Sequence, residues 1–482
     1  MLRNLKHFNA PEIEEKVLQL WKEKDVFKKT LKTVKGKNPK VFKFWEGPPT
    51  ANGRPGIHHI LARSFKDVVL RFKTMQGFLV PRKGGWDTHG LPVEIQVEKQ
   101  LGLTSKKQIE EYGVAEFNKK CKESVWVYKS EWEKLTERMG FWLDLKNPYV
   151  TYHKNYIESL WWIIKQAWDK GLMYKGHKIV NWCYRCGTSL SSHELAQGYK
   201  EVIDNSVYVK FKLLPKQKIV FQQTQGKVQY FTTDEKTYIL SWTTTPWTLP
   251  GNVALAVGEK IDYVVTRQGN ENFILAKDLV EPVLKEVNIK SKFKGKSLIG
   301  ISYQPLFDIK ELKKPTAYKI YPADFVTTTD GTGVVHTAVM YGEDDYNLGK
   351  KIDLPQHHTV NEQGEFTKDV KGFEGMVVKH KETEEKIFEY LEKSGNLFKK
   401  LPYTHEYPHC WRCSTPLLYY ARSSWFVAMS KLKKKLLKSN ESVNWVPKHI
   451  KNGRFGEWLS DIKDWNFSRE RYWGTPLPIW EC

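Results

Sequence analysis

The hydrophobic pattern changes its period within one short stretch of the chain, residues 41–72. Residues 41–45 form an apolar run rich in β-formers, which predicts a buried strand. A loop of prolines and glycines follows at residues 48–56. Apolar residues then recur every three or four positions, at Ile57, Leu61, Phe65, Val68 and Phe72. This spacing predicts an amphipathic helix, so the stretch is expected to form a strand, a loop and a helix.

The rest of the chain divides into a helical part and a β-rich part. A helix is expected over residues 11–27, where Pro11 suits the first helical position, and another over residues 156–170. A strand is expected at residues 77–81 and a loop at residues 84–92. Strand candidates then follow at residues 206–213, 238–242, 253–257, 263–266, 273–276 and 333–336. They predict an independent, largely β region over residues 200–395.

Length and charge narrow the class of protein. A chain of 482 residues exceeds one ordinary core, so two or three domains are expected. Its apolar runs are far shorter than the ~18 residues of a membrane span, and its first residues carry no secretion signal. We therefore expect a cytoplasmic protein with no membrane span. The formal charge of +22 favours a polyanionic partner, or it reflects a lysine-rich lineage with no nucleic-acid role.

Two histidines, His58 and His59, fall in the first turn of the predicted helix, just after Gly56. The unpaired N–H groups and the positive dipole end of a helix favour a phosphate there, and imidazoles can donate hydrogen bonds to it. The same pattern fits an ordinary β–α turn with both histidines on the surface, because Gly-rich loops at helix starts are common in α/β folds.

Four of the six cysteines form two C-x-x-C pairs, Cys183 with Cys186 and Cys410 with Cys413. Two such pairs complete a tetrahedral thiolate site, which favours a structural Zn²⁺ ion. The long separation between the pairs fits an inserted region whose two ends the metal holds together. The alternative is four reduced thiols or redox pairs, although a redox C-x-x-C does not need a second pair.

Two motifs, PPTANGRPGIHH at residues 48–59 and GWDTHGLPVE at residues 85–94, resemble those of the class I aminoacyl-tRNA synthetases, and within them the isoleucyl-tRNA synthetases. The resemblance covers residues 8–482. It implies an α/β fold in which the first half of a Rossmann-type parallel sheet is interrupted by a mostly β editing domain with a zinc knuckle. The expected parts are an N-terminal helical segment (1–40), the first half of the catalytic domain with the first cysteine pair (41–199), the editing domain (200–395), and the second cysteine pair with the return to the catalytic domain (396–482).

The H-x-G-H signature of that family is altered here. The sequence carries Gly56-Ile57-His58-His59, so the first histidine and the glycine have changed places. By the resemblance, His59 keeps its contact with the ATP phosphates. Either a remodelled loop lets His58 do the remaining phosphate work, or adenylation is impaired. The swap is similar to that of a eukaryote-like bacterial subtype. Some members of that subtype escape the antibiotic mupirocin, so mupirocin resistance of this protein is a hypothesis.

The resemblance also implies two sites for the amino acid. In the synthetic site, Asp87 and the carbonyl of Pro48 bind the amino group of isoleucine. Apart from the resemblance, Glu46 begins the loop and is a candidate for a second polar contact. In the editing site, the motifs TTTPWTLPGN, GTGVVHTA and GEDDY contribute Thr243, Thr244, Thr245, Asn252, His336 and Asp345. A second site is needed because one methylene is worth only ~1–3 kcal/mol in a single pocket. On pattern alone, the threonine run is simply a β-strand.

The function that the resemblance implies is attachment of isoleucine to tRNA(Ile) with ATP and Mg²⁺, and hydrolysis of Val-tRNA(Ile), by a monomer. The tripeptide Met429-Ser430-Lys431 resembles part of the second ATP signature, K-M-S-K-S, but it precedes SRERYWG and opens a basic helix, so we reject it. We therefore expect a fragment that cannot complete adenylation alone. The rival interpretations are a non-catalytic RNA-binding paralogue that has lost ATP and, less favoured because the thiolate site is full, a zinc-dependent deacylase.

Overall fold

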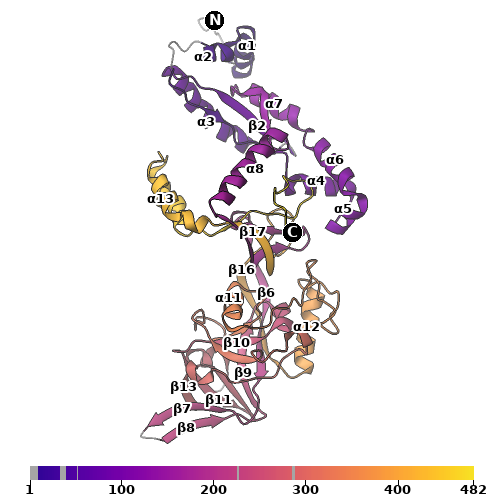
Figure 1. The fold of residues 1–482 in the computed structure, drawn as a ribbon, viewed down its shortest axis with the longest axis vertical. Helices are drawn as coiled ribbons and strands as arrows, with labels where there is room; N and C mark the ends of the chain where they lie inside the picture. Colours follow the sequence, from indigo (N-terminus) through magenta and orange to yellow (C-terminus); the bar gives the residue numbers. More distant parts are fainter. Residues whose placement is uncertain (1–8, 33–38, 51–52, 225–226, 285–287) are drawn as a thin grey trace. The chain divides into compact units, whose positions relative to one another are not determined.

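The computed structural model describes residues 9–32, 39–50, 53–224, 227–284 and 288–482. The chain forms two compact units, Met1–Gly171 with Arg471–Cys482, and Leu172–Glu470 (Figure 1). The expected four-part division stays a prediction. Among the described residues, none of the helices combines the length and the apolar character that crossing a bilayer requires.

The first unit is built on a parallel three-stranded sheet in the order β1-β2-β3, formed by Phe44–Trp45, Arg82–Trp86 and Asp144–Val150. Parallel neighbours need a crossover connection, and helix α3 (Ile57–Met75) supplies it between β1 and β2. The strand, loop and helix expected at residues 41–72 are confirmed, although the strand is shorter and an isolated bridge from Val41 to Leu79 precedes it. Residues 51–52 of the loop lie outside the described residues.

Strand β2 corrects one prediction. It occupies Arg82–Trp86, where a loop was expected from residue 84, while the strand expected at residues 77–81 is reduced to the isolated bridge at Leu79. Gly84 and Gly85 are typical of loops, but here they allow close packing within the sheet. A Cβ atom on Gly85 would lie 2.2 Å from the Tyr149 ring on β3, so only glycine fits.

Helices make up most of the remainder of this unit. They are α1 (Ala10–Glu23), α2 (Val26–Lys32), α4 (Leu91–Leu101), α5 (Lys106–Tyr112), α6 (Val114–Ser124), α7 (Lys129–Arg138) and α8 (Lys154–Asp169). The single helix expected over residues 11–27 is wrong in one respect: it breaks at Asp25, whose φ of 48° is left-handed. Helix α8 confirms the helix expected over residues 156–170.

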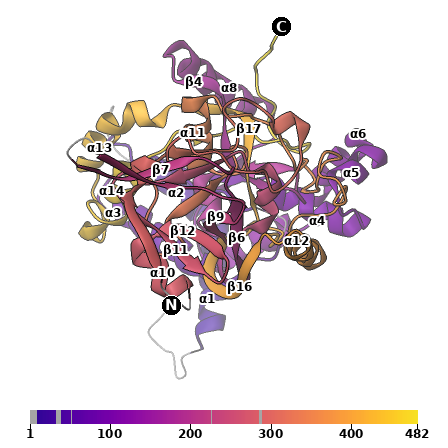
Figure 2. The same ribbon diagram turned by 90° about the horizontal axis from the view of Figure 1, so that it is seen from below.

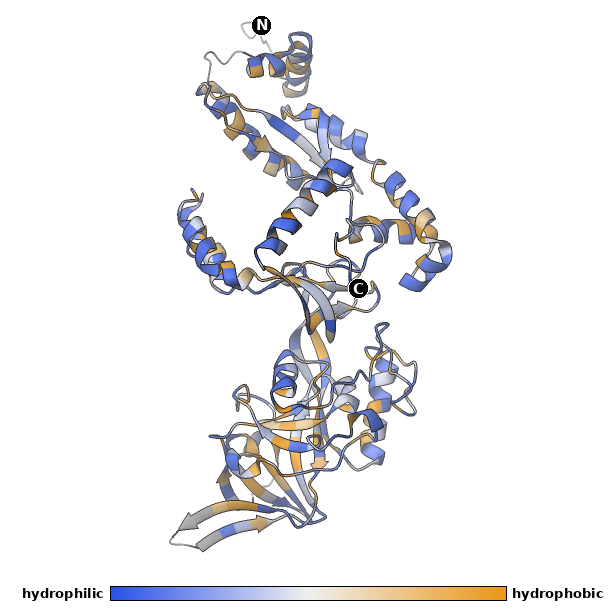
Figure 3. Cartoon of the chain, in the orientation of Figure 1, coloured by the Kyte–Doolittle hydropathy of each residue, from blue (hydrophilic) through white to orange (hydrophobic). Residues whose placement is uncertain are grey.

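Helix α3 keeps the predicted amphipathic pattern, but its apolar face does not enter the described core. The side chains of Ile57, Leu61 and Phe65 are 84%, 62% and 68% exposed. Figure 3 shows apolar and polar residues alternating along this helix. Its buried residues are Arg63 and Leu70, on the side that meets the sheet region. The unit therefore carries an apolar helix face that the described residues leave open.

The second unit contains the mostly β region, and the expected strand candidates are confirmed. Its main sheet has the order β13-β11-β12-β9-β6-β16, and a smaller sheet has the order β14-β10-β15. None of these described strands belongs to the sheet of β1, β2 and β3. The bounds are β6 (Tyr199–Lys212), β9 (Thr237–Thr243), β10 (Ala254–Val257), β11 (Asp262–Gln268), β12 (Glu271–Ala276), β13 (Ile289–Lys294), β14 (Lys319–Pro322), β15 (Val334–Thr337) and β16 (Leu397–Pro408).

A closed apolar core lies between these two sheets and their helices. Phe211, Ile239, Leu255 and Val265 belong to it and are fully buried. Helices α10 (Val280–Val283), α11 (Glu343–Ile352) and α12 (Lys381–Lys393) complete the region, with α12 beside β16 (Figure 2). A hairpin of β7 (Lys218–Thr224) and β8 (Lys227–Thr232) extends from the β13 side (Figure 1).

A separate four-stranded sheet of the second unit, here called the base of that unit, has the order β18-β17-β4-β5. Its strands are β4 (Met173–Cys183), β5 (Thr188–Leu190), β17 (Leu418–Val427) and β18 (Trp465–Asn466). Antiparallel pairing places Trp182 opposite Leu418, which brings the two cysteine turns to the same end of the sheet. The remaining helices are α9 (Ser192–Leu195), α13 (Lys433–Glu441) and α14 (Arg454–Ser460). As expected, residues 429–431 lead into the basic helix α13.

Candidate functional site

The first candidate site is the start of α3. Gly56 is the N-cap residue, and its N–H donates a hydrogen bond of 2.9 Å to Nδ1 of His59. The rings of His58 and His59 lie 3.8 Å apart, centroid to centroid. A Cβ atom on Gly56 would lie 2.8 Å from Cε1 of His58, so the glycine lets His58 fold back over the loop. Gly56 thus has a steric role in the placement of His58.

An aromatic side chain from a distant helix supports this loop. The ring of Trp132, on α7, meets the His59 ring at 4.7 Å, and its indole N–H donates to the carbonyl of Gly53 at 2.8 Å. Burial lowers the pKa of His59, and the nearby charge of His58 lowers it further. A neutral His59 can accept the Gly56 hydrogen bond on Nδ1 and still donate from Nε2. Trp132 gives no local sequence signal, so sequence reasoning missed it.

Asp87 pairs with Thr50 at the ends of adjacent parallel strands, two residues after Pro48. The N–H of Asp87 donates to the carbonyl of Pro49 at 3.0 Å, and the Thr50 hydroxyl lies 3.5 Å from Oδ2 of Asp87. Both Asp87 and Pro48 are half-buried. A carboxylate beside a proline carbonyl can bind an ammonium group by charge-assisted hydrogen bonds.

Glu46 is buried and paired with basic residues of helix α3. Its side chain is 3% exposed and forms ion pairs with Lys66 at 3.1 Å and Arg63 at 3.6 Å. Arg63 in turn donates to the Thr136 hydroxyl at 2.8 Å. These contacts fasten the end of β1 to α3. Oε2 of Glu46 is buried with no hydrogen-bond partner among the described residues.

The second candidate site is a cluster of four sulfur atoms. The Sγ atoms of Cys183, Cys186, Cys410 and Cys413 all lie within 4.8 Å of one another, and those of Cys183 and Cys413 are 3.5 Å apart. Tetrahedral Zn–S bonds of ~2.3 Å require sulfur separations of nearly this size. Gly187 and Ser414, directly after the two pairs, share a φ of 59°, so the two turns are built alike. The residues fit a closed Zn²⁺ site.

The electrostatics of the cluster favour a cation. Hydrogen bonding to Cys183 holds the pKa of Cys413 well below its usual range, whereas hydrogen bonding to Cys186 raises the pKa of Cys183. The thiolate form is therefore favoured at Cys413 and disfavoured at Cys183. A divalent ion would bind all four sulfurs as thiolates.

The third candidate site lies where β9 ends. The hydroxyls of Thr243 and Thr245 are 3.2 Å apart, and the N–H of Thr245 donates to the Thr243 hydroxyl at 3.1 Å. Thr248, in the 3₁₀ turn η1 (Pro246–Gly251), lies 2.8 Å from Nε2 of His336 and donates to the Thr245 carbonyl at 2.8 Å. Sequence reasoning did not single out Thr248, which joins His336 to the threonine run.

His336 and Asn252 are held from different sides. His336 lies on β15 opposite Leu255 of β10, and burial lowers its pKa to about 4, so its imidazole is neutral. Asn252 is 4% exposed, accepts a hydrogen bond from the Tyr303 hydroxyl at 2.7 Å and donates to the Ala254 carbonyl at 2.9 Å. The Asn252 amide is thus occupied by internal bonds that fix the shape of the turn.

Asp345 lies in the first turn of α11, and its Oδ2 accepts the N–H of Ala338 at 3.0 Å. Burial raises the pKa of Asp345 to about 7, and the nearby Asp344 contributes to this shift. The carboxylate therefore ionises fully only above neutral pH or beside a cation. An ammonium group is such a cation.

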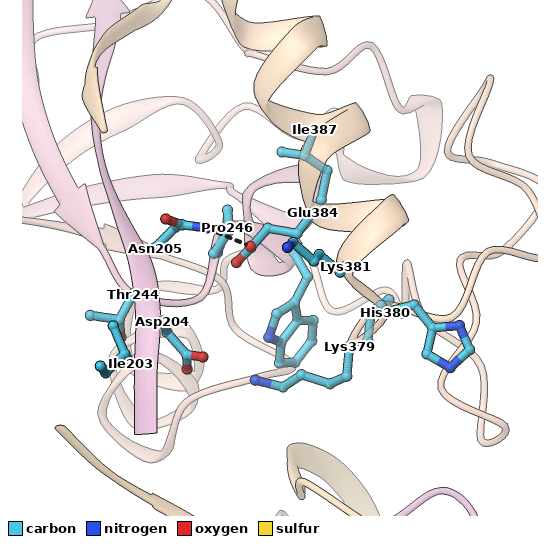
Figure 4. A pocket seen from close by; sticks show the side chains of 12 residues that line it. Ile203, Asp204, Asn205, Thr244, Pro246, Lys379, His380, Lys381, Glu384 and Ile387 are labelled. Atoms are coloured by element: carbon cyan, nitrogen blue, oxygen red, sulfur yellow. Dashed lines mark hydrogen bonds between the residues drawn. The ribbon is translucent and has the colours of Figure 1, made fainter. Parts of the chain in front are cut away.

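A cavity of about 390 Å³ opens beside Thr244 (Figure 4). Its polar wall includes Asp204, Glu384 and Lys379, and Figure 4 shows the ammonium of Lys379 directed toward the side of Asp204. Lys379 lies 3.9 Å above the Tyr407 ring, and burial lowers its pKa to about 8. Sequence reasoning missed Lys379, because a single lysine in a lysine-rich chain gives no signal.

Known sequences resemble nearly the whole chain. A family model described as tRNA synthetases class I (I, L, M and V) matches residues 16–482. The isoleucine–tRNA ligase of Clostridium acetobutylicum is 51% identical over 471 residues, which cover 98% of this chain and 43% of that protein. The enzyme of the same name from Thermus thermophilus is 47% identical over 483 residues, covering 100% and 44%. The chain thus spans less than half the length of these curated relatives.

Solved structures resemble the chain only loosely. The complex of Agrobacterium radiobacter K84 agnB2 LeuRS with tRNA and LeuAMS covers 99% of this chain and 51% of its own at 14% identity, with a TM-score of 0.36. The structure of GlLeuRS-CP1 covers 42% of this chain and 100% of its own at 13% identity, with a TM-score of 0.31. The family assignment therefore rests on the sequence matches. By these matches, the chain belongs to the class I tRNA synthetases of the I, L, M and V group.

Proposed function

We propose that this chain carries the amino-acid activation and editing parts of an isoleucine–tRNA ligase that works in the cytoplasm. The enzyme joins isoleucine to ATP, releases pyrophosphate and passes the acyl group to tRNA(Ile). The observation that carries the proposal is the 51% identity, over 98% of this chain, to a relative of that name. The motifs at residues 48–59 and 85–94 and the threonine run all fall within the residues that the family model matches.

The test is amino-acid-dependent ATP–pyrophosphate exchange by the full-length protein. We expect isoleucine to be favoured over valine by about 10²-fold in kcat/KM, the discrimination that one methylene allows. Preference for leucine or valine would contradict the proposal. Absence of exchange in a protein that still binds tRNA would favour the rival interpretation, a non-catalytic RNA-binding paralogue that has lost adenylation.

ATP binds where β1, the loop and α3 meet. The parallel sheet is the first half of a Rossmann-type sheet, and the exposed apolar face of α3 is consistent with further structure that covers it. The start of α3 suits the ATP phosphates because of its dipole and its unpaired N–H groups. His59 donates to a phosphate, and His58, folded over Gly56, takes the place of the usual first histidine. Mg²⁺ supplies further neutralisation of the phosphate charge.

Isoleucine binds with its ammonium group between Asp87 and the Pro48 carbonyl. The motifs at residues 48–59 and 85–94 support this assignment, as does the pairing of Asp87 with Pro49 and Thr50, the two residues that follow Pro48. Glu46 contributes to the same site through its ion pairs with Lys66 and Arg63, which hold the end of β1 in place.

Editing takes place at the end of β9. The hydroxyls of Thr243, Thr244 and Thr245 orient the ester and the attacking water, and His336 fixes this run through Thr248. Asp345 binds the ammonium group of the misattached valine, and Asn252 holds the turn that shapes the pocket. A structural Zn²⁺ ion on the four cysteines joins the β4 and β17 turns at the base of this region.

A further inference from the structure

We propose that Trp473 and Glu94 are positioning residues for amino-acid binding, because together they hold the turn that carries Asp87. This inference rests on the proposed function and gives a role to two residues, Trp473 and Glu94, the last residue of the motif at 85–94, to which neither that motif nor the matched names give one. Residues 471–475, here called the returning segment, belong to the same compact unit as Asp87 although they are almost 400 positions away.

Glu94 is the fastening point of the returning segment. Its side chain is 1% exposed and lies in the first turn of α4. Oε1 accepts the N–H groups of Tyr472 at 3.0 Å and Trp473 at 2.8 Å, and Oε2 is paired with Arg471 at 2.9 Å. A buried carboxylate needs such partners to offset its desolvation, and these three all come from the returning segment. The carboxylate is therefore committed to holding this segment.

Trp473, held in turn by Glu94, is hydrogen-bonded to the residues that follow Asp87. Its indole N–H donates to the Thr88 carbonyl at 2.5 Å, and its own carbonyl accepts the N–H of Gly90 at 2.9 Å. Its ring meets the His89 ring at 5.2 Å. Gly90 has a φ of 97°, which lets the chain turn from the strand into α4. The turn is thus held at two backbone groups by one distant residue.

The opposite side of the turn is held by β3 and the residues after it. The Thr88 side chain is fully buried, its hydroxyl lies 2.8 Å from that of Thr151, and its N–H donates to the same Thr151 hydroxyl at 2.9 Å. Thr88 therefore has Thr151 on one side and Trp473 on the other. Since Asp87 directly precedes Thr88, loss of the Trp473 bond lets the Asp87 carboxylate rotate out of place. A misplaced carboxylate weakens ammonium binding, while the ATP phosphates at α3 are unaffected.

The test is exchange kinetics of the full-length protein with Trp473→Phe, which removes the indole N–H and keeps an aromatic ring. We expect the KM for isoleucine to rise by about tenfold, the usual size for one lost hydrogen bond in a positioned network, with kcat and the KM for ATP within about twofold of the parent. Glu94→Gln, which loses the charge pairing to Arg471, should shift the same parameter in the same direction. The unfolding midpoint of each variant is measured alongside.

The chain offers a matched control. Trp161, on α8, donates its indole N–H to the Pro476 carbonyl at 2.8 Å, so Trp161→Phe removes the same kind of bond from a neighbouring residue of the C-terminal stretch. It should leave the KM for isoleucine unchanged. An unchanged isoleucine KM in both Trp473→Phe and Glu94→Gln, or an equal rise in the KM for ATP, overturns the positioning role and leaves the proposed function standing. A parent protein without isoleucine-dependent exchange overturns both.

Discussion

The two units differ in how completely their candidate sites are enclosed by the described residues. At the start of α3, His58 is exposed, and a few loop hydrogen bonds and one indole define the geometry. At the end of β9, the threonine run and His336 rest on a core whose members, such as Ile239 and Leu255, are fully buried. The geometry at the end of β9 is therefore set by packing, whereas the geometry at the start of α3 is set by a small number of polar contacts.

Substitution of a cysteine of the four-sulfur cluster should have the largest effect, and the effect falls on the second unit. Cys410→Ser should lower zinc content from about one ion per chain to none and unfold the base of the second unit, since structural Zn²⁺ binding contributes ~10–16 kcal/mol. Metal analysis and thermal unfolding measure this. Cys482→Ser, at an exposed thiol outside the cluster, is the control. A full zinc equivalent retained by Cys410→Ser would contradict the assignment.

Substitutions of His58 and His59 test the site at the start of α3. His59→Ala and His58→Ala should each lower isoleucine-dependent exchange by about 10²–10³-fold in the full-length protein, because each donor stabilises phosphate charge. Deacylation of Val-tRNA should be unchanged, since the two sites are built separately. His153→Ala, at an exposed histidine of the same unit, is the control. Normal exchange in His58→Ala alone would show that His58 has no phosphate role.

The role proposed for Asp345 predicts that deacylation depends on pH. Its pKa is raised to about 7, so the group is protonated below that pH and ionised above it. Because the ammonium group binds the ionised form, deacylation of Val-tRNA should rise as pH increases through about 7. Asp345→Asn should lower the rate by about 10²-fold and flatten the profile, the loss typical of one electrostatic contact. Asp344→Asn, at the exposed neighbour, should keep the activity and shift the midpoint to lower pH. A flat profile in the parent would refute this role.

The smallest expected effect is that of Phe65→Ala, and it compares the packing of α3 with that of the core of the second unit. Phe65→Ala, on the open face of α3, should change the free energy of unfolding of this chain by less than about 0.5 kcal/mol. Ile239→Ala, in the closed core, should cost about 2–5 kcal/mol. Chemical denaturation measures both. A large loss of stability in Phe65→Ala would mean that the apolar face of α3 is already covered.

Much of the fold followed from local pattern. The periodicity of residues 57–72 predicted α3, the alternation after residue 206 predicted the β region, and the cysteine spacing predicted the four-sulfur cluster. Each of these signals is local: it lies within one helix, within single strands or within one C-x-x-C turn. The position of β2 was missed because its two glycines are typical of loops, and only the neighbouring Tyr149 shows why they belong in the sheet.

The sequence by itself determined most of the element types, the candidate metal ligands and, through its motifs, the family resemblance. Only the tertiary structure decided which distant groups support them: Trp132 beneath His59, Thr248 beside His336, and Trp473 against Thr88. It also placed Glu46 in ion pairs with α3. The physical reason is that periodicity reports which face of an element is apolar, whereas hydrogen bonds and ion pairs depend on the approach of segments that the local pattern does not relate.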